Sequence, residues 1–181
     1  MTPASDFESL LCSQSVSSMC LDWLREDIPS FVDVGGLVVG SVRRRANLYL
    51  KESGVFSGKP FFDGMFGCMK NCSVHWVESD GEETAQYVPM AAIEGKYYSF
   101  SGKPILLAVV EGPANDVLRC ERAALCALSR CSGVSTSAHR MVSAARESGW
   151  KGRIAGTRKT TPGFRVVEKY GLMVGGADTH R

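Results

Sequence analysis

The chain has 181 residues, of which 44% are hydrophobic and 22% are charged, and its formal net charge is +2. This composition is ordinary for a folded globular protein, and so small a charge does not indicate a nucleic-acid-binding protein. No apolar run is long enough to span a membrane, and the acidic amino terminus lacks the apolar centre of a secretory signal. We therefore expect a cytoplasmic protein of one or two domains, without membrane contact.

Up to about residue 110 the chain alternates between helix and strand patterns. The expected elements are a helix over 17–27, a turn and strand over 34–40, a strand over 42–51, a helix over 60–69, and strands over 74–77, 89–93 and 105–110. The clearest signal is over 42–51, where apolar and polar residues alternate as in a half-exposed strand. This part of the chain therefore has the character of a mixed α+β domain.

The rest of the chain has the pattern of a strand–helix series. Helical spacing predicts one helix over 115–131 and a second over 137–148. The short segment 153–157, partly apolar and bounded by glycine, fits a buried strand. After it, Thr161 can cap a helix and Gly171 can end it.

Seven cysteines are spread along the chain. Their odd number, and the spacing of Cys68 and Cys72 without histidines to match, do not fit a zinc site. Cys120, Cys126 and Cys131 fall on one predicted helix, among leucine and alanine. We expect the cysteines to be reduced and to fill the core.

The segment Gly156-Thr157-Arg158-Lys159-Thr160-Thr161-Pro162-Gly163 puts two cations into a turn between the predicted strand and helix. In α/β folds, ligands bind where strands end and helices begin. Arg158 offers a planar fork for a carboxylate or phosphate, and Lys159 offers a mobile point charge. A second cationic pair, His180-Arg181, follows. These residues alone support an anion site and a pair of solvated loop charges about equally.

Several stretches around this turn also have the residues of one enzyme family. They are Glu111-Gly112-Pro113-Ala114, Glu121-Arg122-Ala123-Ala124-Leu125, Arg130-Cys131-Ser132-Gly133, the turn itself, Glu168-Lys169-Tyr170-Gly171, Val174-Gly175-Gly176 and His180-Arg181. Looser matches occur at Trp23-Leu24-Arg25-Glu26-Asp27 and over 53–63. Together they resemble quinolinate phosphoribosyltransferase, densely over 108–181 and more loosely over 17–91. An eight-residue identity such as the turn is far more specific than a lone glycine-rich loop.

The resemblance implies an α+β, sandwich-like amino-terminal domain over 1–114, then a linker helix and the opening of an α/β barrel over 115–181. It implies a pentosyltransferase of NAD biosynthesis, which converts quinolinate and phosphoribosyl pyrophosphate to nicotinate mononucleotide, pyrophosphate and CO2. A homodimer or higher homo-oligomer is also implied, as is Mg2+ bound with phosphoribosyl pyrophosphate.

The resemblance further implies which residues bind the substrates. Arg122 would reach from its helix into the active site of a neighbouring subunit. A cationic pocket for the carboxylates of quinolinate and the phosphates of phosphoribosyl pyrophosphate would be formed by Thr157, Arg158, Lys159, His180 and Arg181. The chemistry needs such a pocket, because a dianionic dicarboxylate must meet a highly charged pyrophosphate ester. No residue of the chain is predicted to be a catalyst or a metal ligand.

The chain departs from the family in two places. Residues 94–107 have the character of an insertion, and the chain stops at Arg181, although an α/β barrel needs about 200–250 residues. We therefore expect an incomplete barrel, and the alternative function is that of a truncated, non-catalytic form that only dimerises or binds. A third hypothesis, an RNA-binding protein, depends only on Arg43-Arg44-Arg45. That short run lacks interleaved aromatic residues, so no nucleic-acid partner is expected.

Overall fold

The computed structural model describes residues 11–29, 33–50, 54–77, 80–81 and 106–179, together with the backbone of 83–84 and 92–93. The predicted insertion over 94–107 lies almost wholly outside the described residues, and His180 and Arg181 lie outside them too.

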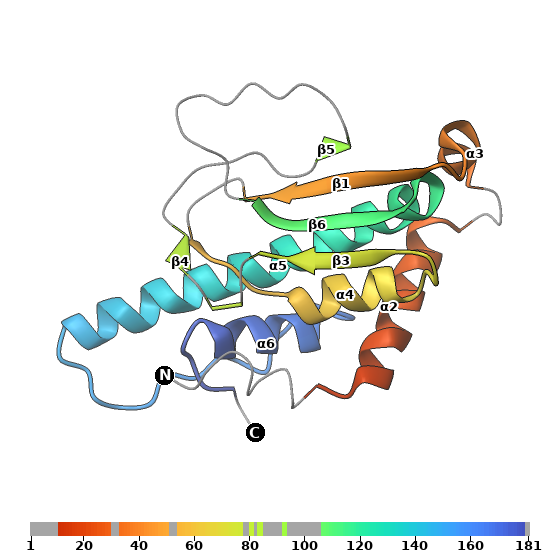
Figure 1. Cartoon of the computed structure of the whole chain (residues 1–181). Helices are drawn as coiled ribbons and strands as arrows, with labels where there is room; N and C mark the ends of the chain where they lie inside the picture. Colours follow the sequence, from red (N-terminus) through yellow and green to blue (C-terminus); the bar gives the residue numbers. More distant parts are fainter. Residues whose placement is uncertain are drawn as a thin grey trace.

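An antiparallel sheet forms one layer of the molecule (Figure 1). Its strands, in spatial order, are β3 (Ser73–Trp76), β6 (Leu106–Pro113), β1 (Arg43–Tyr49) and β5 (Ala92–Ile93). A separate strand pair joins β2 (Gly54–Val55) to β4 (Glu83–Thr84). Alternation along the strands brings Leu48, Ala108 and Val110 to one buried face. The strands predicted over 42–51, 74–77 and 105–110 are confirmed.

Helices cover the buried face of the sheet. They are α2 (Ser13–Asp27), α4 (Lys59–Gly67), α5 (Ala114–Glu147) and α6 (Arg165–Val174). A further short helix, α3 (Val34–Val39), packs on α5 and contributes none of its described side chains to the hydrophobic core. The long helix α5 packs on β1 and β6, and α2, α4 and α6 pack on α5 (Figure 1). One hydrophobic core joins these elements, with Phe61, Leu107 and Tyr170 among its fully buried side chains. The helices predicted over 17–27 and 60–69 are confirmed.

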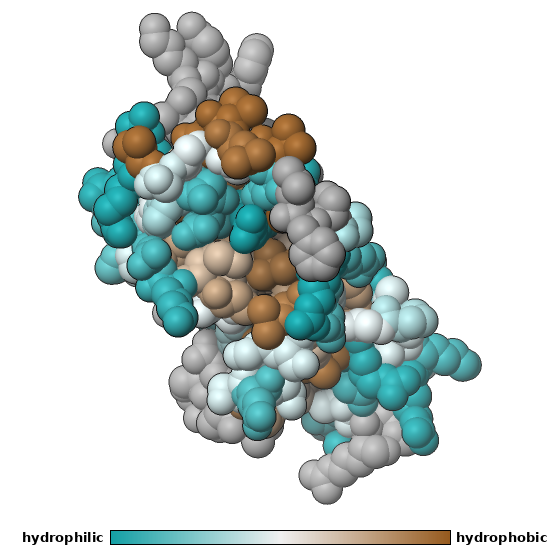
Figure 2. All heavy atoms as spheres, turned by 90° about the vertical axis from the view of Figure 1, so that its right-hand side faces the viewer, coloured by the Kyte–Doolittle hydropathy of each residue, from teal (hydrophilic) through white to brown (hydrophobic). Residues whose placement is uncertain are grey.

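The segment 34–40, expected to be a turn and a strand, is instead the short helix α3. Asp33 caps this helix, because its Oδ1 accepts a hydrogen bond from the N–H of Gly36 at 3.0 Å. The apolar side chains of α3 face outward, since Leu37 is 74% exposed and Val38 is 83% exposed. Figure 2 looks onto this end of the molecule and shows apolar atoms gathered there. The apolar run therefore forms a surface helix, whereas a turn and a strand were expected.

The two helices expected over 115–131 and 137–148 are one continuous helix, α5, so the predicted break between them is wrong. Gly133 lies within α5, and a Cβ atom built on it would meet no atom within 4 Å. A glycine inside a helix costs only about 1 kcal/mol, which contacts elsewhere can offset.

Hydroxyl side chains near Gly133 make such contacts with β2 and the residues that follow it. Ser132 Oγ donates to the carbonyl of Ser57 at 2.8 Å. The N–H of Val55 donates to Thr136 Oγ1 at 2.9 Å. These residue types weaken an isolated helix, but here their hydrogen bonds to other elements stabilise it.

The helix after the cationic turn begins and ends later than the sequence predicts. Thr161 does not cap it, because α6 begins at Arg165, after a turn in which Gly163 has a φ of 80°. Gly171 does not end it, because α6 continues past this residue. A Cβ on Gly171 would lie 2.8 Å from the carbonyl oxygen of Cys131. Gly171 therefore allows α6 to pack closely on α5.

Candidate functional site

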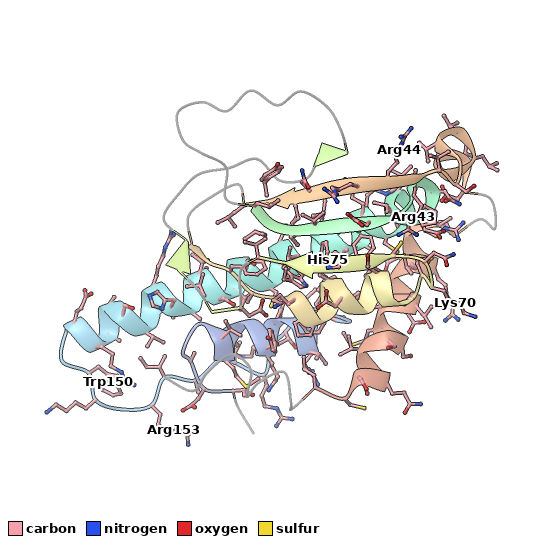
Figure 3. All side chains as sticks on the ribbon, viewed as in Figure 1. Arg43, Arg44, Lys70, His75, Trp150 and Arg153 are labelled. Atoms are coloured by element: carbon pink, nitrogen blue, oxygen red, sulfur yellow. The ribbon has the colours of Figure 1, made fainter. Side chains whose placement is uncertain are left out.

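The cationic turn follows a short parallel pairing of two backbone segments. A single parallel bridge joins Ala155 to Asp178, and the N–H of Gly156 donates to the carbonyl of Asp178 at 2.8 Å. Arg153, labelled in Figure 3, adds a side-chain bond from its Nε to Asp178 Oδ2 at 2.7 Å. The strand expected over 153–157 is thus limited to this bridge. Since α6 connects the paired segments, they form the start of a β-α-β unit, and the turn lies at the end of its first strand.

The side chains of Thr157, Arg158 and Lys159 are exposed on this turn. The N–H of Lys159 donates to Thr157 Oγ1 at 3.1 Å, which stabilises the turn locally. Within the described part of the chain, neither Arg158 nor Lys159 makes a side-chain hydrogen bond or an ion pair. Two adjacent cations without an acidic partner create a positive potential that favours an anion.

Glu168 of α6 ties this turn to α5. Its carboxylate accepts hydrogen bonds from the N–H of Thr161 at 3.1 Å and from the hydroxyl of Thr161 at 2.7 Å. Arg130 of α5 donates to the same carboxylate from Nη2 at 2.6 Å and from Nε at 3.1 Å. Its Nη2 also donates to Thr161 Oγ1 at 2.6 Å. We call Arg130, Thr161 and Glu168 the clasp.

The clasp keeps Glu168 ionised. Burial by itself would raise the pKa of Glu168, but the hydrogen bonds from Thr161 and Arg130 outweigh it and lower the pKa below its ordinary value. Neither Glu168 nor Arg130 was predicted from the sequence to be a site residue. One available signal is that Glu168 follows Phe164 and precedes Gly171 at helical spacing, on the face of α6 that packs inward. An acid at such a position needs a partner.

Arg122 lies on α5, where its guanidinium pairs with Asp27 at the end of α2. Nε and Nη2 of Arg122 lie 3.1 and 3.0 Å from Asp27 Oδ2, and the Arg122 side chain is 69% exposed. Arg122 lines a pocket of about 450 Å³ together with Trp23, Cys126 and Phe164. The rings of Trp23 and Phe164 stack there with centroids 5.3 Å apart.

Phe164 connects this pocket to the cationic turn, but Arg158 and Lys159 do not line it. The structure of the single chain therefore places Arg122 in a separate pocket from the two turn cations. His180 and Arg181, the other predicted members of the anion site, lie outside the described residues.

The cysteines are all free thiols. Cys20, Cys120 and Cys131 are buried, and burial raises the pKa of Cys20 and of Cys131 to about 12. This agrees with a core-filling role. Cys12 and Cys126 are exceptions to the prediction, because both are exposed, and Cys126 lies on α5 at the pocket beside Arg122.

The arginine run at the start of β1 has partners within the protein. Arg45 Nε donates to Glu111 Oε1 at 2.8 Å, and this contact lowers the pKa of Glu111. Arg43 Nη1 donates to the carbonyl of Asn71 at 3.3 Å. Arg43 and Arg44 lie at the start of β1, next to α3 (Figure 3). These contacts give the run a role in the sheet surface.

Over the described ranges, no three His, Cys, Asp or Glu side chains are grouped so that they could hold a metal ion. In the same part of the chain, no helix is both long enough and apolar enough to cross a membrane.

Comparison with known proteins finds the same family that the residues of the turn resemble. The family model "Quinolinate phosphoribosyl transferase, N-terminal domain" matches residues 33–103, and that of the C-terminal domain matches residues 134–181. Curated nicotinate-nucleotide pyrophosphorylases (carboxylating) from Rattus norvegicus and Homo sapiens are 43% and 44% identical to this chain over 172 residues, which is 95% of it.

Solved structures give the same result. A protein from Streptococcus pyogenes titled NadC superimposes with a TM-score of 0.78 at 26% identity, over 94% of this chain and 56% of that one. The nicotinate-nucleotide pyrophosphorylase from Francisella tularensis gives 0.75 at 25% identity, over 94% and 54%. The chain spans about half the length of the curated relatives it matches, 51% of the rat protein and 52% of the human one. Because both domain models match in order, and close relatives align over nearly all of it, the chain belongs to the quinolinate phosphoribosyltransferase family.

Proposed function

We propose that the chain is the quinolinate-binding part of a carboxylating nicotinate-nucleotide pyrophosphorylase, a pentosyltransferase of NAD biosynthesis. The observation that carries this proposal is the cationic turn. It presents Arg158 and Lys159 to solvent without an acidic partner among the described residues, at the end of a parallel strand. Quinolinate has two carboxylates, which match one guanidinium fork and one ammonium group.

Each cation would have a distinct task. The guanidinium of Arg158 would orient one carboxylate of quinolinate through paired hydrogen bonds, and Lys159 would neutralise the other carboxylate as the anionic pyrophosphate ester approaches. Thr157 would add a hydroxyl donor. His180 and Arg181 would extend the same pocket. With both substrates oriented, the ring nitrogen forms a bond to the anomeric carbon as pyrophosphate leaves, and the 2-carboxylate then departs as CO2 while a proton takes its place.

Arg122 would serve the site of a second subunit in a homodimer or higher homo-oligomer. Its side chain is 69% exposed, and its partner Asp27 holds it at the surface. An exposed ion pair of this kind contributes little to stability, so Arg122 can exchange Asp27 for an anion on a neighbouring subunit.

Mg2+ would enter with phosphoribosyl pyrophosphate, whose charge it neutralises. Among the described residues no group of three metal-binding side chains is available for it, and the acids that the family resemblance implies for this ion are not among the residues of this chain. The division into an amino-terminal domain over 1–114 and the opening of an α/β barrel over 115–181 is part of the same proposal, as are the insertion over 94–107 and a cytoplasmic location.

Calorimetry on the purified chain tests the proposal, with quinolinate as ligand and nicotinate as the control that lacks the 2-carboxylate. We expect saturable binding of quinolinate, at least about tenfold tighter than that of nicotinate because one charged hydrogen-bonding group is missing. Equal affinity for the two ligands, or no binding of either, would contradict it. An assay of pyrophosphate release with phosphoribosyl pyrophosphate and Mg2+ then distinguishes an active chain from the alternative, a non-catalytic form that only binds or dimerises.

A further inference from the structure

The cationic turn is tied to the rest of the molecule at both of its ends. At the first end, the N–H of Gly156 donates to the carbonyl of Asp178 at 2.8 Å. At the other end, the N–H and hydroxyl of Thr161 bond to the carboxylate of Glu168 at 3.1 and 2.7 Å. The exposed cations lie between these two ties. Because an exposed loop has little packing of its own, its conformation depends on how its ends are held.

The tie at Thr161 is stronger than a single hydrogen bond, since Arg130 joins both of its members. Arg130 Nη2 lies 2.6 Å from Glu168 Oε1 and 2.6 Å from Thr161 Oγ1. One guanidinium group thereby links α5, α6 and the turn. The side chain of Glu168 is only 11% exposed, while that of Arg130 is 49% exposed. Because the carboxylate of Glu168 is so enclosed, it must accept all of these hydrogen bonds to offset the cost of its burial. Thr161, which donates two of them, is therefore held beside Glu168.

The turn itself adds only local bonds. Lys159 N–H donates to Thr157 Oγ1 at 3.1 Å, and Arg165 Nε donates to Thr160 Oγ1 at 3.1 Å. These bonds shape the turn but do not fix it relative to α5. The link to α5 comes through Glu168 and Arg130.

We propose that Glu168 is a positioning residue, which acts through Thr161 to hold the Arg158–Lys159 turn in the conformation that receives a dicarboxylate anion. The inference rests on the proposed function of the turn, and it gives Glu168 no contact with the ligand. The physical reason is preorganisation. A rigid dianion binds two cations more tightly when the backbone that carries them is already ordered, because less conformational entropy is lost on binding.

The first test needs no ligand and uses the complete 181-residue chain. Amide hydrogen exchange is compared between Glu168→Gln and the matched control Glu147→Gln, which neutralises an exposed carboxylate on α5. In Glu168→Gln we expect exchange over 157–161 to quicken about tenfold, with the buried amides of α6 and the control unchanged. Unchanged exchange in the turn, or an equal increase along all of α6, would overturn the proposal.

The second test is a double-mutant cycle on quinolinate binding, with Lys159→Ala as the other substitution. If Glu168 acts through the turn, Glu168→Gln weakens binding about tenfold in the wild-type background and has little effect once Lys159 is gone. An equal loss in both backgrounds means a general structural role and contradicts the proposal.

If Glu168→Gln does not fold, Thr161→Val takes its place in the double-mutant cycle. Thr161 is exposed, and this substitution removes its hydroxyl group while it preserves the shape of the side chain. The same loss of coupling to Lys159 is expected, with a smaller weakening of binding, and full additivity overturns the proposal. If the wild-type chain binds no quinolinate, the proposed function fails, while the exchange experiment still decides whether Glu168 orders the turn.

Discussion

Two arginines of this chain differ in what surrounds them, and the difference separates structural from ligand-binding cations. Arg130 directs Nε and Nη2 to Glu168 and Thr161, so those donors are already used inside the protein. Arg158, on the turn that Thr161 closes, has no hydrogen-bonding partner within the described ranges. An arginine whose donors are unused can direct two of them at once to a carboxylate, which is why Arg158 is the better candidate for binding.

Replacing Arg158 by Lys tests the importance of the guanidinium shape. The substitution keeps the charge but removes the planar fork, so the two parallel hydrogen bonds to a carboxylate become one. We expect quinolinate affinity to fall by about 1.5–3 kcal/mol, the range for a hydrogen bond to a charged group. Arg140→Lys is the matched control, because Arg140 is also exposed but lies on α5, away from the turn. Calorimetry that finds equal affinity for both variants would return Arg158 to the class of solvated loop charges.

At the scale of the elements, the sequence predicted most strands and helices but misplaced several ends. The strand at 42–51 was predictable because Ala46 and Leu48 alternate with outward-facing polar residues. The length of α5 was not predictable, because contacts such as the bond from Ser132 to Ser57, a residue far away in sequence, stabilise it where Ser132 and Gly133 favour a break. Local propensity cannot report such long-range contacts.

The candidate site could likewise be predicted only in part. The cations of the turn were predictable, since their residue types and their place between strand and helix are visible in the sequence. The clasp was not predictable, because it forms only when Arg130 of α5 and Glu168 of α6 come into contact in the folded chain. Arg122 was identified by family resemblance, and its pairing with Asp27 became visible only in the fold.

Two glycines on neighbouring helices should respond oppositely to substitution by alanine. At Gly133 the new Cβ would meet no atom within 4 Å, so the gain in helix propensity should stabilise the chain by about 0.5–1 kcal/mol. At Gly171 the Cβ would lie 2.8 Å from the carbonyl oxygen of Cys131, and the forced separation of α5 and α6 should destabilise it by about 1–3 kcal/mol. Urea unfolding measures both values. A stabilised Gly171→Ala variant would mean that α6 does not pack closely on α5.

Considered as a whole, the molecule has a core that crosses the boundary between its two matched domains. Tyr170 of α6 is fully buried, and its hydroxyl donates to Asp80 Oδ2 at 2.8 Å. Asp80 also accepts from the N–H of Gly58 at 2.8 Å, just before α4. The start of the carboxy-terminal domain is therefore packed against the amino-terminal one within a single chain. Such packing leaves the turn and Arg122 on the surface, where a second subunit could bring them together.

A mixing experiment tests whether Arg122 of one subunit completes the site of another. Under the proposal, Arg122→Ala and Lys159→Ala each weaken quinolinate binding so far that only intact sites fill in this titration, but a mixed dimer has one site with both lesions and one site with neither. After reversible dissociation and random reassociation, about half of the dimers are mixed, so about a quarter of the wild-type binding sites should return. Arg122→Ala should leave the fold intact, because its ion pair with Asp27 is exposed. Calorimetric stoichiometry measures the recovery, and mass spectrometry of the intact dimers verifies subunit exchange. If exchange is complete and no sites return, Arg122 acts within its own subunit or has no part in binding.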